Sequence, residues 1–291
     1  MVGKMKWSAA IAAVVMLCGI YGCGGDQPAP KPKVRPRAGG VAKKTDDAPP
    51  ANGAAAPVAE GWGDLTMRMV YDGTPPAPAR ISITKDTEYC GMHDLVDEEL
   101  IVGEDGGLAN VVLWLRDKNV KVHPDYEATA GDEVELDNKN CRYDPHVQLM
   151  RTSQKLLLKN TDTIGHNVKG DCLVNPAFNE IVAAEGQTVK TLPKEERFPV
   201  RVGCNIHPWM SGWLVVRDDP YMAVSDENGN LTIKNLPAGE YEFQFWQEKA
   251  GFLDGFEVQG KKPSKGRVKL TVNPGENDLG EIKVPASALA K

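Results

Sequence analysis

Four residues whose side chains bind soft or borderline metals stand in two short motifs of the chain. His166 lies in the stretch Gly165-His166-Asn167-Val168, and Cys204, His207 and Met210 follow with the spacing Cys-x-x-His-x-x-Met. A thiolate, two imidazoles and a thioether are the donors of a mononuclear copper site with three strong ligands and a long axial methionine. Sulfur favours Cu(I) and imidazole suits both oxidation states, so such a site can keep copper through a one-electron transfer. Zinc competes for the same donors, but a methionine ligand favours copper.

Short strands separated by turns would have to position these ligands. Residues 200–202 precede the Cys-x-x-His-x-x-Met loop and residues 212–216 follow it, so two adjacent strands would present three ligands from one loop. His166 would enter from a neighbouring strand. The alternating runs and turn residues continue elsewhere, and helical turns are expected only near 93–99 or 219–222. The pattern predicts an all-β fold with Greek-key connections, with further strands at 65–71, 108–115, 155–158, 231–233 and 240–246.

The two ligand motifs resemble those of the cupredoxins, and within them the amicyanin-like and plastocyanin-like group with a short ligand loop. The resemblance implies one type 1 copper ion with His166, Cys204 and His207 as strong ligands and Met210 as the weak axial ligand. It also implies that Asn167 joins the two ligand loops by hydrogen bonds, and that His207 is partly exposed and passes the electrons.

Pro208 follows this last histidine and has no N–H. It therefore removes one possible hydrogen-bond donor to the cysteine sulfur. We hypothesise that this raises the reduction potential of the site.

A second β unit follows a hinge at Asp218-Asp219-Pro220. Residues 222–285 carry hairpin turns such as Asn228-Gly229 and resemble the carboxypeptidase regulatory-like, or transthyretin-like, sandwich. We therefore expect a cupredoxin-like domain with an N-terminal β extension at 60–217 and a smaller β-sandwich at 218–291.

The N-terminal residues predict export. Lys4 and Lys6 precede an apolar run that ends in Ile20-Tyr21-Gly22-Cys23, which resembles a bacterial lipobox. We expect residues 1–22 to be a signal peptide, Cys23 to be lipidated, and residues up to 59, rich in proline, alanine and lysine, to be a disordered tether. A plain signal peptide with an incidental cysteine is the alternative. The layout resembles bacterial cupredoxin lipoproteins that carry the family label methylamine utilization protein.

The other cysteines suit an oxidising compartment. We pair Cys90 with Cys141, because each lies at the edge of an expected strand, and Cys172 is then unpaired, although the sequence does not fix the connectivity.

Charge is unevenly divided along the chain. The formal net charge of −6 consists of +5 on residues 1–59 and −11 on residues 60–291. Such an acidic body argues against nucleic acid as a partner and suits a basic redox protein.

These observations favour a monomeric electron carrier, anchored by lipid at the periplasmic or cell-surface side of a membrane, with a c-type cytochrome as one possible partner. One alternative is a non-redox binding module for carbohydrate or a surface protein, and another is copper storage or delivery. An enzyme is not expected, because His93, His123 and His146 are too few and too scattered for additional copper clusters.

Overall fold

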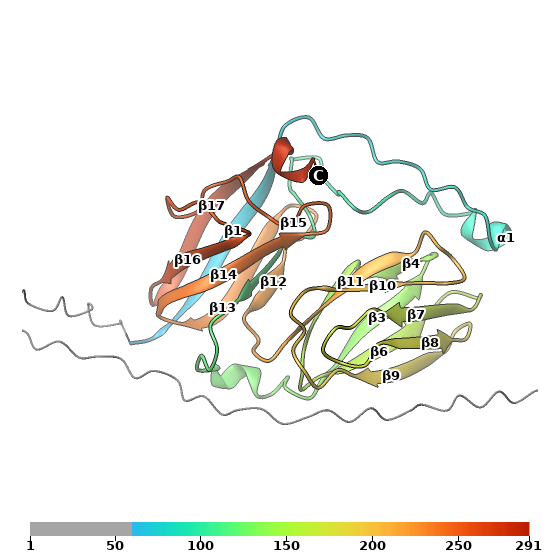
Figure 1. The fold of residues 1–291 in the computed structure, drawn as a ribbon, viewed down its shortest axis with the longest axis horizontal. Coiled ribbons are helices and arrows are strands. Elements are labelled where there is room, and N and C mark those ends of the chain that lie inside the picture. Colours follow the sequence, from blue (N-terminus) through green and yellow to red (C-terminus); the bar gives the residue numbers. More distant parts are fainter. Residues whose placement is uncertain (1–59, 291) are drawn as a thin grey trace, which may run out of the picture. The chain divides into compact units, whose positions relative to one another are not determined.

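The computed structural model describes residues 60–290, which form a nearly all-β structure (Figure 1). The helical elements are the single turns α1 (Thr87–Cys90), η1 (Pro124–Tyr126) and η2 (Ala286–Leu289). None of the helices among these residues is long and apolar enough to cross a membrane. The predicted signal peptide, the lipidated Cys23 and the tether up to residue 59 lie outside the described residues.

Two sheets form a first sandwich from the middle of the chain. One sheet has the order β4-β3-β6-β9 and the other β5-β11-β10-β7-β8. Alternate residues of both sheets point inward, including Leu158, Val202 and Leu214, which are fully buried in one apolar core. Its strands are β3 (Glu133–Lys139), β4 (Arg142–Asp144), β5 (Val147–Arg151), β6 (Lys155–Asn160), β7 (His166–Gly170), β8 (Phe178–Val182), β9 (Gln187–Thr191), β10 (Val200–Gly203) and β11 (Ser211–Arg217).

A second sandwich is built from strands at both ends of the described chain. Its sheets have the orders β13-β1-β17 and β12-β2-β14-β15, and β16 also pairs with β14. Leu65, Phe243 and Leu270 lie in its core. Its strands are β1 (Trp62–Asp72), β2 (Val112–Leu115), β12 (Met222–Val224), β13 (Asn230–Pro237), β14 (Gly239–Gln247), β15 (Gly251–Phe252), β16 (Arg267–Val272) and β17 (Gly275–Pro285).

This pairing corrects the predicted division at residue 217. The N-terminal strands β1 and β2 do not extend the first sandwich: β1 lies between β13 and β17, and β2 lies between β12 and β14. The alternation of Leu65, Met67 and Met69 shows that β1 has one buried face. Such a pattern does not identify the strands against which that face packs. The second unit therefore consists of residues from both sides of the first.

The two sandwiches share an apolar contact. Val112 and Trp114 of β2 pack in one cluster with Val147, Val215 and Trp246. Beside this cluster, His146 Nε2 lies 2.5 Å from Glu248 Oε2, and His146 Nδ1 lies 3.7 Å from Glu98 Oε2. His146 is therefore a buried polar link between elements that are distant in sequence, although its surroundings in the sequence suggested no such role.

The His146 link predicts a fall in stability at alkaline pH. Burial would lower the pKa of His146, but the hydrogen bond with Glu248 and the negative charges of Glu248 and Glu98 outweigh burial and raise it to about 9. A raised pKa means that the stabilisation is complete below about pH 6.5, the usual histidine pKa, and is lost as the pH rises through 9. We expect the free energy of unfolding to fall by at most about 3 kcal/mol across this range.

Urea unfolding of the wild type and of His146→Gln from pH 6 to pH 10 measures this effect. The variant should have a flatter pH dependence than the wild type. An unchanged slope in His146→Gln would show that the link does not titrate as described.

A segment between β1 and β2 folds over one end of the first sandwich. We call residues 79–97 the cap. Its two arms are joined by main-chain hydrogen bonds, from Ile81 N to Leu95 O and from Asp97 N to Ala79 O, and α1 lies between them. A disulfide joins Cys90 of the cap to Cys141, which is the pairing predicted from the sequence. Ile81, Ile83, Tyr89, Ile164 and Trp209 pack around this disulfide.

Candidate metal centre

The two ligand motifs meet at the end of the first sandwich that the cap covers. His166 is the first residue of β7, and the loop 204–210 joins β10 to β11. Strands β7 and β10 are hydrogen-bonded neighbours, with Gly203 opposite Lys169. The strand pairing therefore brings together two motifs that lie 38 residues apart in the sequence.

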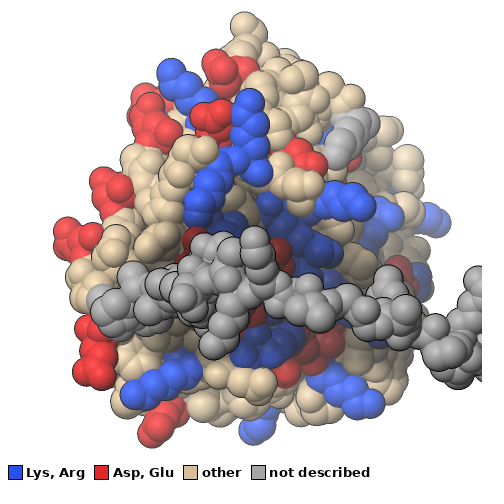
Figure 2. Space-filling view, turned by 60° about the vertical axis from the view of Figure 1, so that its left-hand side comes forward, with Lys and Arg blue, Asp and Glu red and all other residues tan. Residues whose placement is uncertain are grey.

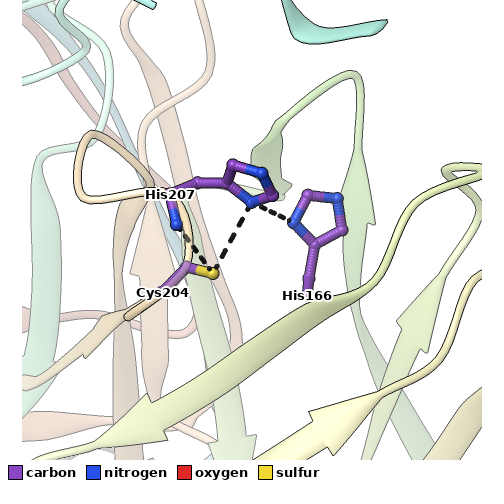
Figure 3. A group of neighbouring side chains, drawn as sticks. All are labelled: His166, Cys204 and His207. Atoms are coloured by element: carbon purple, nitrogen blue, oxygen red, sulfur yellow. Dashed lines mark hydrogen bonds between the residues drawn. The ribbon is translucent and has the colours of Figure 1, made fainter. Parts of the chain in front are cut away.

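Cys204, His166 and His207 form one compact group of donors. The Cys204 Sγ atom and one nitrogen of each imidazole all lie within 4.8 Å of one another. The two Nδ1 atoms are 2.9 Å apart, and His207 Nδ1 is 3.8 Å from the sulfur. Figure 3 shows the imidazoles meeting beside the sulfur, His166 from a strand and His207 from the loop. This arrangement can hold a single metal ion through one sulfur and two nitrogens.

An aspartate binds the outer nitrogen of each imidazole. His166 Nε2 lies 2.8 Å from Asp162 Oδ2, and His207 Nε2 lies 2.8 Å from Asp86 Oδ2. A carboxylate on the outer nitrogen fixes the ring orientation and makes the inner nitrogen a stronger metal ligand. In both residues, Nδ1 is therefore the nitrogen free to bind a metal.

Neither aspartate was identified as a site residue from the sequence. Asp162 lies four residues before His166, and this proximity was the only available clue. It also accepts hydrogen bonds from Tyr89 Oη at 2.8 Å and from the Cys141 main-chain N–H at 2.9 Å. Asp86 is 121 residues from His207 and reaches it only through the fold of the cap.

The electrostatic environment favours an ionised sulfur. Burial raises the pKa of Cys204, but hydrogen bonds with His166 and with nearby main-chain N–H groups outweigh burial and lower it. Burial lowers the pKa of His166, whereas its contacts with Asp162 and Cys204 outweigh burial and raise it. For His207, burial is the largest influence and the pKa is lowered. A thiolate beside a neutral imidazole is the state in which these groups bind a metal.

Asn167 connects the two loops, as the resemblance implied. Its Oδ1 accepts a hydrogen bond from the Asn205 main-chain N–H at 2.8 Å and lies 3.4 Å from Cys204 Sγ. The sulfur also accepts a hydrogen bond from the His207 main-chain N–H at 3.4 Å. Met210 is buried, and its carbonyl accepts a hydrogen bond from the Cys204 N–H at 3.2 Å, which closes the loop.

The exposure of His207 differs from what the resemblance implied. Its side chain is fully buried, not partly exposed. Asp86 of the cap binds its outer nitrogen, and the Trp209 ring lies 5.2 Å from the imidazole ring, centroid to centroid. The cap therefore contributes to the burial of His207 through Asp86.

A hollow of about 340 Å³ lies on another side of the centre. Cys204, Asn205, Pro208 and Met210 form its inner lining, and Lys169, Asp171 and Arg201 contribute charged groups. Pro208 is exposed here. The cap therefore covers the centre at His207, whereas Cys204 lines this hollow on the side of the loop.

A second possible donor group overlaps the first. Cys141, Asp162 and His166 also lie close enough together to hold an ion. The sulfur of Cys141 belongs to the disulfide with Cys90, so it cannot act as a thiolate ligand. The group of Cys204 and the two imidazoles is the one whose chemistry fits a metal. The mixture of one soft sulfur with two imidazoles is the donor set of copper sites, and zinc accepts it as well.

Part of the chain is similar to solved structures of known proteins. No protein family model and no curated protein matches the chain. Among solved structures, a copper-containing nitrite reductase from Thermus scotoductus SA-01 is 18% identical, with a TM-score of 0.27, over 29% of this chain and 22% of that one. The chain thus spans about a fifth of the length of that reductase.

Two smaller proteins are matched over nearly their whole length. The purple cupredoxin from Nitrosopumilus maritimus is 18% identical over 29% of this chain and 98% of its own, with a TM-score of 0.25. A mutant of amicyanin in its reduced Cu(I) form is 18% identical over 36% of this chain and 98% of its own, with a TM-score of 0.27. These likenesses are limited to about a third of the chain.

Proposed function

We propose that the chain binds one copper ion in a type 1 site and carries single electrons between redox proteins. The observation that carries this proposal is the buried convergence of the Cys204 sulfur with one nitrogen each of His166 and His207. Bound copper would supply the Cu(II)/Cu(I) couple. In this proposal Met210 is the weak axial ligand.

The surrounding residues suit electron transfer because they limit movement. Strands β7 and β10 hold the two ligand motifs, Asn167 bonds both loops, and Asp86 and Asp162 fix the imidazoles. A donor set that barely moves when its charge changes lowers the reorganisation needed for each transfer.

We place the path for electrons at the hollow beside the ligand loop. The cap covers His207, whereas Cys204, Pro208 and Met210 line that hollow, so a partner that docks there would meet residues of the ligand loop. We propose that the partner is a c-type cytochrome or another redox protein that docks weakly at this hollow. We also propose that the protein is exported, that Cys23 carries lipid, and that residues 24–59 tether the described part to a membrane.

Redox titration of the copper-loaded protein tests the carrier role. We expect one electron per protein to bleach the visible colour and one-electron oxidation to restore it repeatedly. Mixing the reduced protein with a cationic c-type cytochrome should give fast electron exchange that slows at high salt. A site that loses its copper on reduction would instead support storage or delivery.

Removing the negative charge of Asp86 should weaken copper binding. In Asp86→Asn the outer nitrogen of His207 loses a carboxylate partner, so we expect the affinity for copper to fall about 10-fold. Competition with a chelator measures the affinity, and the visible spectrum reports any change at the sulfur. Asp94→Asn is the matched control, because Asp94 lies in the same cap and contacts Arg80 at the surface. Equal affinities in the two variants would exclude a role for Asp86 in positioning the ligand.

A further inference from the structure

A second cavity, away from the metal centre, has an unusual concentration of positive charge. It measures about 270 Å³ and is lined by residues of both sandwiches. Five of the eight lining residues are basic, one is Glu195 and two are phenylalanines; the basic residues are Arg116, Lys118, Arg197, Arg217 and Arg267. We call this cavity the arginine cleft. Residues 60–291 carry a net charge of −11, so their overall composition does not account for this cluster of basic side chains.

The basic residues of the arginine cleft have fewer anionic partners than positive charges. Lys118 and Arg217 share one anionic partner, Glu195. Arg116 pairs with Glu242 at 2.8 Å. Neither Arg197 nor Arg267 forms an ion pair with any of residues 60–290. Figure 2 shows one face of the molecule on which basic side chains gather near the middle, with some acidic side chains among them and others along the left edge.

Arg217 gives the cleft a buried cation with an unused donor. Its side chain is 7% exposed, and its Nη1 lies 2.5 Å from Glu195 Oε1. The Leu115 carbonyl accepts a hydrogen bond from Nη2 at 3.2 Å, and the guanidinium lies 5.6 Å from the centre of the Trp114 ring. Its Nε is buried and has no hydrogen-bond partner among the described residues. Arg217 therefore places a buried positive charge at the wall of the cleft, and Glu195, which balances it, is shared with Lys118.

The apolar wall limits the size and kind of ligand. Phe198 is 47% exposed, and its ring lies 5.7 Å from that of Phe252, centroid to centroid. Guanidinium groups bind the paired oxygens of carboxylates and phosphates through two parallel hydrogen bonds. The volume is just below the range of pockets for drug-sized ligands. The cleft thus suits a small organic body that carries several oxyanion groups.

We propose that the arginine cleft binds a small polyanion with at least two carboxylate or phosphate groups. Arg197 and Arg267 contribute charge at the surface without an ion-pair partner among the described residues, and Arg217 contributes a buried positive charge at the wall of the cleft. The phenylalanine rings contact the apolar part of the ligand. This proposal does not depend on the metal centre or on electron transfer.

Thermal unfolding and calorimetric titration of the metal-free full chain test the proposal, with citrate and pyrophosphate as probes. We expect either probe to raise the unfolding temperature more than sodium chloride at the same ionic strength, because a ligand that binds only the folded state stabilises it. Comparing the two probes distinguishes carboxylate from phosphate recognition. An equal rise with chloride would overturn the proposal, since it would show ionic screening only.

Variants locate the binding site. In Arg197→Gln/Arg267→Gln we expect probe binding at least 10-fold weaker, with an unfolding temperature in the absence of probe that is unchanged or higher because repulsion is relieved. Arg80→Gln is the matched control, because Arg80 is an exposed arginine on the cap, and its binding should equal that of the wild type. Equal binding in the double variant and in Arg80→Gln would place the anion elsewhere and overturn the proposal.

Discussion

Replacing Cys204 with serine is expected to abolish the visible colour of the copper-loaded protein and to weaken copper binding by at least about 100-fold. The sulfur is the only thiolate in the donor group, and its ionisation is favoured by His166 and by main-chain N–H groups. A serine hydroxyl does not ionise near neutral pH and is a hard donor that does not favour Cu(I). Visible absorption and competition with a chelator measure both effects.

Cys172→Ser is the matched control for this experiment. Cys172 is the other free cysteine of the described residues, and burial raises its pKa to about 11, so it stays protonated. We expect its substitution to leave the colour and the affinity unchanged. If Cys204→Ser kept the wild-type spectrum, the ligand assignment would be wrong.

Removing the disulfide of the cap is expected to have the largest effect on stability. Cys90 and Cys141 are 51 residues apart, and closing a loop of that size stabilises a fold by about 2–4 kcal/mol. We expect Cys90→Ala/Cys141→Ala to lower the free energy of unfolding by about that amount. Denaturant unfolding followed by tryptophan fluorescence measures it, and Cys172→Ala provides the cysteine control.

The same double variant tests whether the cap controls access to His207. The disulfide anchors the segment that carries Asp86 and Tyr89, which contact His207 and Asp162. We expect amide hydrogen exchange within residues 79–97 to accelerate more than exchange in the core strands of the second sandwich. Uniform acceleration across the protein would mean that the disulfide stabilises the fold without holding the cap specifically.

The local part of the site could be predicted from the sequence. Cys204 and His207 lie three residues apart in one loop, and the strands on either side of it have clear alternation. The role of Met210 as an axial ligand stays a prediction. Asn167 follows His166 directly, so its position in the first motif could also be predicted. Donor chemistry and short spacing carried these predictions because they do not depend on distant parts of the chain.

The predictions that failed concern features that depend on contacts between residues distant in the sequence. The burial of His207 results from Asp86, a residue that reaches the site through a cap anchored by a disulfide. The alternation in β1 predicted a strand, but its pairing with β17 joins the two ends of the described chain. His146 was considered only as a metal ligand. It contacts Glu98 and Glu248, and these three residues lie in three separate segments of the chain, so no sequence pattern indicated the contacts.

The visible absorption and electron paramagnetic resonance spectra of the full chain after addition of one equivalent of Cu(II) test the central claim most directly. A site made by Cys204, His166 and His207 predicts an intense thiolate-to-copper charge-transfer band and a narrow copper hyperfine splitting. A colourless protein that binds zinc in preference, or a weakly coloured one with a wide hyperfine splitting, would contradict the type 1 assignment.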